Sequence, residues 1–150
     1  MSTEQKNKAE ETFKKHLHFL SNGNITEWVN LFTEDGILEF PYATKGYPKK
    51  IQGRDNLMEY MVNFPNHFKV KFINLHFHPT GNPNLVIAEF NSDGIAIETG
   101  NPYLQKYISV VTTNNDGEIL KYVDFWNPII AMEALGVKIN DEEFANQFIN

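Results

Sequence analysis

The sequence predicts an α+β fold in which N-terminal helices pack on a curved antiparallel sheet and form a cone. Apolar residues recur at helical spacing in the first third of the chain, whereas alternating or continuously apolar segments separated by turns fill the part after Val70. No repeat or linker divides the 150 residues. A chain of this length buries enough surface for one core, so we expect 1–150 to form a single domain.

Three helices are expected before the long strands that begin at Val70. An amphipathic helix is predicted over 6–20, where apolar residues recur on one face between charged ones: Ala9, Phe13, Leu17 and Leu20. A shorter helix is expected after Asn24, which can cap it, and a third after Gly53. The chain is expected to end in a short helix over 130–135 and an acidic segment, 136–150, that forms a tail or a further helix.

Strands fill most of the rest of the chain. The strand pattern covers 37–40, 70–78, 85–90, 103–113 and 119–126. Ser92-Asp93-Gly94 and Asn114-Asn115-Asp116-Gly117 have the composition of turns. The order of helices first and strands afterwards favours an antiparallel meander over a parallel βαβ series.

Asp124 is the leading catalytic candidate. Alternation along the last strand places it on one face with Tyr122 and Trp126. Burial beside aromatic rings disfavours the charged carboxylate and raises the pKa toward neutrality, which is what a general acid or base requires. The alternative is structural: an aspartate near a strand end often bonds a backbone amide or pairs with Lys or Arg.

Two histidines and a glutamate are weaker candidates. The same alternation places His76 and His78 on the face of 70–78 that also carries Phe72, so we expect either histidine to assist by hydrogen bonding to developing negative charge. The pair could also chelate a metal ion, but the sequence identifies no third ligand, and no metal site is predicted. Glu89 is either a cavity acid or the partner of a basic side chain.

Composition excludes several classes of function. The absence of cysteine excludes thiol nucleophiles, cysteine-ligated metals and disulfides, and the net charge of −6 disfavours nucleic acid as a partner. Motifs for nucleotide phosphates, serine hydrolases and zinc proteases are missing. The charged N-terminus resembles neither a signal peptide nor a membrane span, so a cytoplasmic protein without membrane contact is expected. The 12 Phe, 6 Tyr and 2 Trp exceed the needs of one core and suggest a lined cavity.

Several short motifs, taken in order, resemble the nuclear transport factor 2-like superfamily, and within it the SnoaL-like group with PhzA/PhzB-type and ketosteroid-isomerase-like proteins. The resemblance covers about 7–135. Its motifs are Glu39-Phe40-Pro41-Tyr42-Ala43 with Gly46-Tyr47-Pro48, Gly53-Arg54, Ala88-Glu89-Phe90, Gly100-Asn101-Pro102-Tyr103 with Tyr107, and Asp124-Phe125-Trp126-Asn127-Pro128.

This resemblance implies a cone-shaped α+β barrel, a homodimer joined through the outer sheet face, and a hydrophobic pocket between sheet and helices. It also implies proton-transfer chemistry without a cofactor, with Asp124 at the position of the family's acid/base residue. Phe40 stands where ketosteroid isomerases carry their base, so a true steroid isomerase is not expected.

The sequence therefore supports three hypotheses. The first is a cofactor-independent isomerase, cyclase or dehydratase in which Asp124 moves a proton on a small apolar carbonyl or polycyclic compound. The other two are a protein that binds such a molecule without turnover and a dimerisation module. The residues expected to hold the molecule are Trp28, Phe40, Tyr42, Tyr60, Glu89, Tyr107, Tyr122 and Trp126.

Overall fold

A six-stranded sheet in the order β2-β1-β6-β5-β4-β3 forms the body of the protein. The computed structural model describes residues 2–149. The elements are α1 (Ser2–Ser21), α2 (Ile25–Val29), β1 (Phe32–Glu39), β2 (Lys50–Gln52), α3 (Arg54–Met61), α4 (Phe64–His67), β3 (Phe68–His78), β4 (Leu85–Ala96), β5 (Lys106–Thr113), β6 (Ile119–Trp126), α5 (Pro128–Ala134) and α6 (Asp141–Ile149). None of the helices in this described part is both long and apolar enough to cross a membrane.

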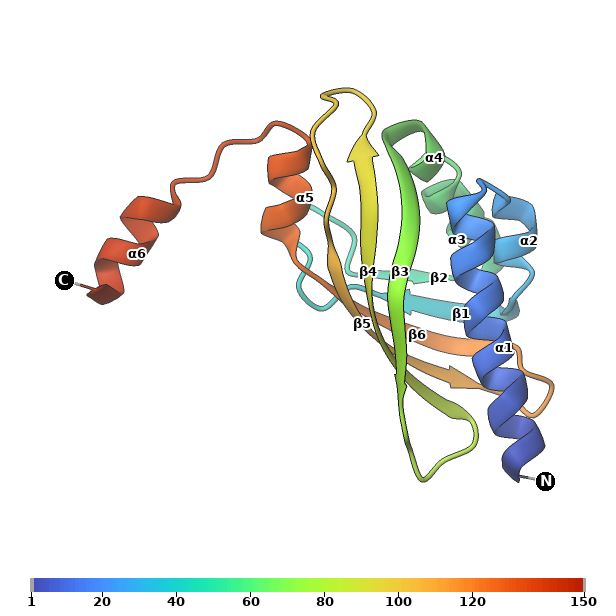
Figure 1. The fold of residues 1–150 in the computed structure, drawn as a ribbon. Coiled ribbons are helices and arrows are strands. Elements are labelled where there is room, and N and C mark those ends of the chain that lie inside the picture. The colour runs from blue at the N-terminus through green and yellow to red at the C-terminus, as the bar shows by residue number, and fades with distance from the viewer. Residues whose placement is uncertain (1, 150) are drawn as a thin grey trace.

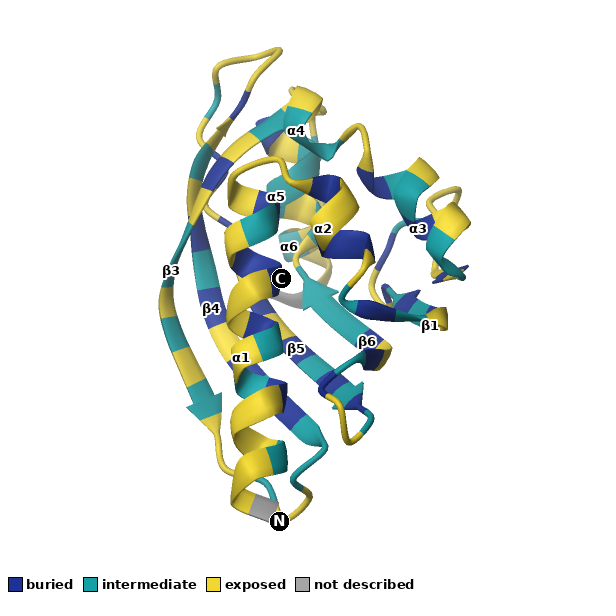
Figure 2. Ribbon diagram, turned by 90° about the vertical axis from the view of Figure 1, so that its right-hand side faces the viewer, coloured by how far each residue is buried: buried dark blue, intermediate teal, exposed yellow. Residues whose placement is uncertain are grey.

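The sheet is strongly curved but does not close, and helices cover its concave face (Figure 1). Helix α1 packs there against β3 and β4, with its buried residues turned toward the sheet (Figure 2). Phe13 of α1 is 1% exposed and its ring meets those of Phe77 and Phe90 edge to face. The predicted α+β class is therefore confirmed, because helices pack on the concave face of a curved, unclosed sheet.

A β-bulge in β3 reverses the predicted orientation of its second half. Ile73 pairs with Asn91 and His76 pairs with Glu89, so β3 contains one more residue than β4 between these two pairs. Asn74 takes up the extra residue with a left-handed φ of 59°, which asparagine tolerates better than most residues. One extra residue exchanges the two faces of everything that follows. The expectation that His76 shares the face of Phe72 was therefore wrong.

The bulge conformation leads to a stability prediction at Asn74. Asn74→Val is expected to lower the free energy of unfolding by about 1–2 kcal/mol, because a β-branched residue is strained at positive φ. Asn74→Gly is the matched control, since it removes the same side chain while accepting that φ. Urea unfolding of both variants measures the difference, and equal stabilities would show that the backbone there does not hold this conformation.

Several boundaries also differ from the sequence expectations. Strand β4 continues to Ala96 through Ser92-Asp93-Gly94, so the predicted turn was wrong. Strand β2 was not predicted, and β1 begins at Phe32 and pairs with β6 in parallel. Within the described part of the C-terminal segment, α6 projects away from the sheet (Figure 1).

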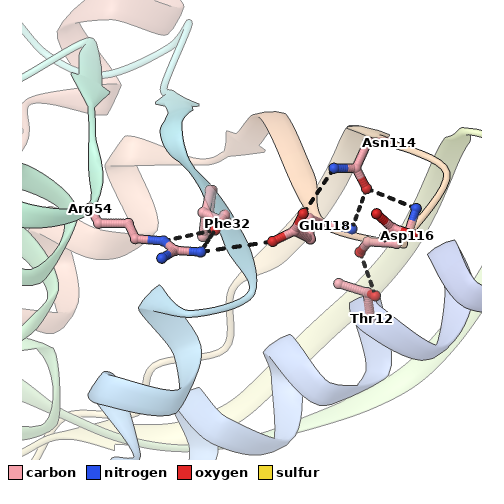
Figure 3. A network of polar contacts seen from close by, with 7 residues as sticks. Thr12, Phe32, Arg54, Asn114, Asp116 and Glu118 are labelled. Carbon is pink, nitrogen blue, oxygen red and sulfur yellow. Dashed lines mark hydrogen bonds and ion pairs between the residues drawn. The ribbon is translucent and has the colours of Figure 1, made fainter.

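A polar network fixes α1 against the β5–β6 turn (Figure 3). The Thr12 hydroxyl donates to the Gly117 carbonyl oxygen at 2.7 Å, and Arg54 donates to the Phe32 carbonyl oxygen. Asn114 Nδ2 donates to the Glu118 carboxylate, which lies 3.8 Å from the Arg54 guanidinium. These contacts hold α1 at one position along the sheet, and with it the side chain that follows Thr12 by one helical turn.

Candidate active site

A cavity of about 150 Å³ lies between the concave face of the sheet and the helices. Most of its lining is aromatic, and the lining contains a single carboxyl group and no Lys or Arg. The lining residues are His16, Leu20, Phe40, Tyr47, Tyr60, Met61, Phe64, Phe68, Phe72, Phe90, Tyr103, Tyr107, Tyr122, Asp124, Trp126, Ala131 and Leu135. Such a lining suits an uncharged ligand with a few polar atoms.

Asp124 projects into this cavity from β6. The residue as a whole is half-buried, so its carboxyl group can be reached from the cavity, but the surrounding protein removes most of its water. Burial is the larger influence and raises the pKa of Asp124 from 3.8 to about 7, while a hydrogen bond from the Ser109 hydroxyl at 3.4 Å acts in the opposite direction. No Lys or Arg pairs with Asp124 among the described residues, so the structural alternative of an ion pair has no support.

Tyrosine hydroxyls supply hydrogen-bond donors around the same cavity. The Tyr47 and Tyr60 hydroxyls are hydrogen-bonded to each other, and those of Tyr103 and Tyr107 lie 3.5 Å apart. Burial is the main cause that raises the pKa of each of these four hydroxyls, and the negative charge of Asp124 adds to it. All four therefore remain protonated at neutral pH. Each hydroxyl has a single hydrogen. Tyr107 donates to Tyr103, and one of Tyr47 and Tyr60 donates to the other, so one hydroxyl of each pair keeps its hydrogen for an oxygen of a bound molecule.

A buried chain of polar groups leads from the protein interior to Asp124. Trp28 Nε1 lies 2.8 Å from His16 Nδ1, and His16 Nε2 lies 2.9 Å from the Tyr122 hydroxyl. The Tyr122 hydroxyl lies 2.7 Å from Ser109 Oγ, which in turn donates to Asp124. Burial lowers the pKa of His16 from 6.5 to about 3, so its ring is neutral at physiological pH.

The structure separates the sequence-predicted residues into two groups. Asp124 lines the cavity together with five of the residues expected to hold a ligand: Phe40, Tyr60, Tyr107, Tyr122 and Trp126. Trp28 lies behind His16, where its indole N–H is bonded, and does not line the cavity.

The remaining candidates lie away from the cavity. Because of the Asn74 bulge, His76 and His78 point outward from β3, and His78 Nε2 lies 2.9 Å from the Glu89 carboxylate. Among the side chains that the structure describes, no three histidine, aspartate or glutamate residues come together as a metal site. Tyr42 and Glu89 border a more open depression of about 690 Å³ on the outer face. The structure therefore does not bring either histidine together with Asp124.

Sequence reasoning missed His16 and Ser109. His16 falls on the apolar stripe of α1, three residues after Phe13 and four before Leu20. Ser109 occupies the inward face of β5 between Tyr107 and Val111, and it is 0% exposed. A polar residue within an apolar stripe is the available signal, because burying it is costly unless it has a hydrogen-bond partner.

Comparisons with known proteins agree with this fold. The SnoaL-like domain model matches residues 13–122. An uncharacterised PhzA/B-like protein of Pseudomonas aeruginosa is 44% identical over 128 residues, which are 85% of this chain and 90% of that protein. A proposed isomerase from Bacillus subtilis has a crystal structure with a TM-score of 0.86 and 38% identity, covering 90% of this chain and 97% of that one.

A more distant structure, a phenazine biosynthesis-related protein from Pseudomonas aeruginosa, shares the fold. Its TM-score is 0.76 at 23% identity, and the alignment covers 92% of this chain and 91% of that one. The predicted resemblance to the nuclear transport factor 2-like superfamily is thus confirmed along most of the chain. With a family model over 13–122 and a relative at 44% identity, the chain belongs to the SnoaL-like family.

Proposed function

We propose that this protein is an isomerase or cyclase that acts without a cofactor on a small, uncharged carbonyl compound. The observation that carries the proposal is the isolated Asp124 carboxyl group, whose pKa of about 7 leaves both protonation states populated near neutral pH. Membership of the SnoaL-like family and the similarity to a proposed isomerase support the same class of reaction.

The proposed reaction begins with Asp124 as a base. The carboxylate takes a proton from the carbon next to the substrate carbonyl, and the electron pair of the broken C–H bond moves to give an enolate. Hydrogen bonds from tyrosine hydroxyls such as Tyr60 and Tyr103 stabilise the negative charge on the enolate oxygen. Asp124 then returns the proton to a different carbon, which shifts a double bond. Alternatively, the enolate carbon attacks a second carbonyl of the substrate and closes a ring, and Asp124 gives its proton to the alkoxide oxygen that this attack forms.

The size and charge of the cavity narrow the substrate class. A volume of about 150 Å³ is below the usual range for drug-sized ligands and matches a single ring. A monocyclic or short-chain carbonyl compound therefore fits better than a polycyclic one. An anionic substrate is disfavoured, because the lining offers no Lys or Arg to offset its charge next to Asp124.

The experiment uses cyclohex-3-en-1-one, a monocyclic ketone whose double bond moves into conjugation when a proton is shifted. We expect the wild-type protein to accelerate this isomerisation, and Asp124→Asn to reduce the rate by at least about 10²-fold because the base is lost. Asp93→Asn, the same exchange on the outer face of β4, is the control. Measurement is by ultraviolet absorbance and by proton NMR.

The binding hypothesis has a separate outcome in this experiment. A protein that binds the ketone with equal affinity before and after Asp124→Asn, and returns it unchanged, would contradict the enzymatic proposal. The homodimer also stays a proposal, supported by apolar side chains that the outer sheet face presents in neighbouring positions: Ile87, Ile108, Val110 and Phe125.

A further inference from the structure

We propose that His16 and Trp28 are positioning residues for Asp124, at the head of a one-way chain of hydrogen-bond donors that ends on its carboxylate. The role of Asp124 as the reacting group rests on the proposed function, whereas the direction of the chain follows from the hydrogen-bonding chemistry of its members. No member except Asp124 contributes the reacting proton. The proton on Asp124 consequently enters and leaves through the cavity.

The direction is set at Trp28. An indole N–H can only donate, so His16 Nδ1 must accept and carries no proton. A neutral imidazole then carries its proton on Nε2, which donates to the Tyr122 hydroxyl oxygen. The Tyr122 hydroxyl must therefore direct its own hydrogen to Ser109 Oγ.

The last link completes the sequence. Ser109 Oγ has accepted a hydrogen bond from Tyr122, and its own hydrogen points to Asp124 Oδ1. Every donor from Trp28 onward thus faces the carboxylate, and such chains strengthen each bond by polarising the next. Trp28, Ser109 and Tyr122 are at most 1% exposed and His16 is 5% exposed, so water does not compete for these bonds.

The same geometry prevents the chain from conducting protons. Reversing it would require a proton on His16 Nδ1, and that proton would face the Trp28 indole N–H. Protonation of His16 at both nitrogens meets the same obstacle, and burial lowers the pKa of this ring to about 3. The proton that Asp124 takes from a substrate atom therefore returns to that substrate or to water in the cavity.

Asp124 is the one group in the described cavity lining whose charge changes between pH 5 and pH 8. The other titratable groups that face the cavity are His16 on α1, Tyr47 before β2, Tyr60 on α3, Tyr103 before β5, Tyr107 on β5 and Tyr122 on β6. The tyrosines stay protonated because their pKa values are raised, and His16 stays neutral. The pKa measured for the Asp124 carboxyl in this range therefore reflects its hydrogen-bond donors, without a change of charge on another group of the cavity.

The test measures the chain without any substrate. Nitrogen-15 NMR of the histidine ring reports which nitrogen of His16 carries the proton, and carbon-13 NMR of the Asp124 carboxyl gives its pKa. We expect the Nε2–H form at every pH from 5 to 8. Trp28→Phe removes the first donor of the hydrogen-bond chain. It is expected to raise the pKa of Asp124 by about 0.5 pH unit, because the hydrogen bond from Ser109 to the carboxylate is weakened.

Two variants of His16 separate positioning from proton conduction. His16→Gln can accept from Trp28 through its amide oxygen and donate to Tyr122 through its amide nitrogen, so it is expected to keep the wild-type pKa of Asp124. His16→Leu breaks the chain and is expected to behave like Trp28→Phe. A proton path through the imidazole would fail equally in both His16 variants.

Phe32→Leu controls for packing, because Phe32 meets the Trp28 ring edge to face, whereas the N–H of that ring is bonded to His16. The proposal is overturned if His16 carries its proton on Nδ1, or if His16→Gln shifts the Asp124 pKa as His16→Leu does. A shift in Phe32→Leu as large as that in Trp28→Phe would also overturn it. None of these readouts depends on turnover, so they stand if cyclohex-3-en-1-one proves inert.

Discussion

Asp124→Asn is expected to make the protein more stable at pH 8 by up to about 4 kcal/mol, while the two proteins are nearly equal in stability at pH 4. The folded pKa of Asp124 is raised from 3.8 to about 7 by burial. Between these two values the folded protein holds a proton that the unfolded chain has released, so wild-type stability falls as the pH rises through this window. As the pH rises above 7, the folded protein increasingly carries the buried charge, and asparagine removes it.

His16 produces the opposite slope. Burial lowers its folded pKa from 6.5 to about 3, so the unfolded chain binds a proton that the folded protein does not, and stability falls as the pH drops below 6.5. Between about pH 4 and pH 6.5 the contributions of His16 and Asp124 cancel. The wild-type curve alone therefore hides both groups, and only differences between variants reveal them.

Urea unfolding at pH 4, 6 and 8 of the wild type, Asp124→Asn and His16→Gln measures these differences. Asp124→Asn is expected to gain relative to the wild type as the pH rises, and His16→Gln to gain as the pH falls. The exposed Asp93→Asn should show neither trend. An Asp124→Asn difference that does not change with pH would mean that the carboxyl group is well hydrated in the folded protein, and the basis for its role as a base would be lost.

A buried carboxyl group that destabilises the fold is unexpected unless it has a use. A core position filled only for stability would carry an apolar residue or a paired charge. Asp124 has a single hydrogen-bond donor from the protein, Ser109, among the described side chains, and it faces a cavity. Such a conflict between local stability and residue choice is typical of functional sites.

The strand face of Asp124 was predicted correctly because β6 is regular around it. Tyr122, Asp124 and Trp126 alternate without interruption, and all three line the cavity. His76 and His78 were misplaced because alternation assumes an unbroken strand, and the extra residue at Asn74 exchanges the faces. An asparagine in a strand is a weak sign of a bulge, so the pattern alone could not reveal the change.

His16 could not be assigned a role from the sequence because its partners are distant along the chain. It binds Trp28 12 residues away and Tyr122 106 residues away. Helical periodicity predicted α1 and its buried face correctly. It could not predict which strand residue lies opposite a given turn of α1, because that depends on how the helix packs on the whole sheet. The position of α1 along the sheet is fixed in part by the contact of Thr12 with the β5–β6 turn, which joins positions separated by 105 residues.

Gly94→Ala is expected to destabilise the protein by more than about 3 kcal/mol, within the range seen when a backbone must move to admit new atoms. Gly94 lies near the end of β4, directly opposite Val70 of β3. A Cβ atom added there would lie 2.3 Å from the Lys69 carbonyl oxygen and 2.9 Å from the Val70 Cα, so the two strands would have to separate. Gly81→Ala is the control, because nothing lies within 4 Å of its added Cβ.

The effect of Gly94→Ala should reach the cavity as well as the fold. The Gly94 carbonyl oxygen accepts a hydrogen bond from the Tyr103 N–H at 2.8 Å, and Ser92 Oγ donates to the Tyr103 carbonyl oxygen at 3.0 Å. Displacing β4 therefore moves a tyrosine that lines the cavity together with Asp124. Urea unfolding measures the loss of stability, and the Asp124 titration in the surviving folded protein measures the displacement. A folded Gly94→Ala protein within about 1 kcal/mol of the wild type would show that β4 turns away from β3 at Ser92-Asp93-Gly94, as the sequence first indicated.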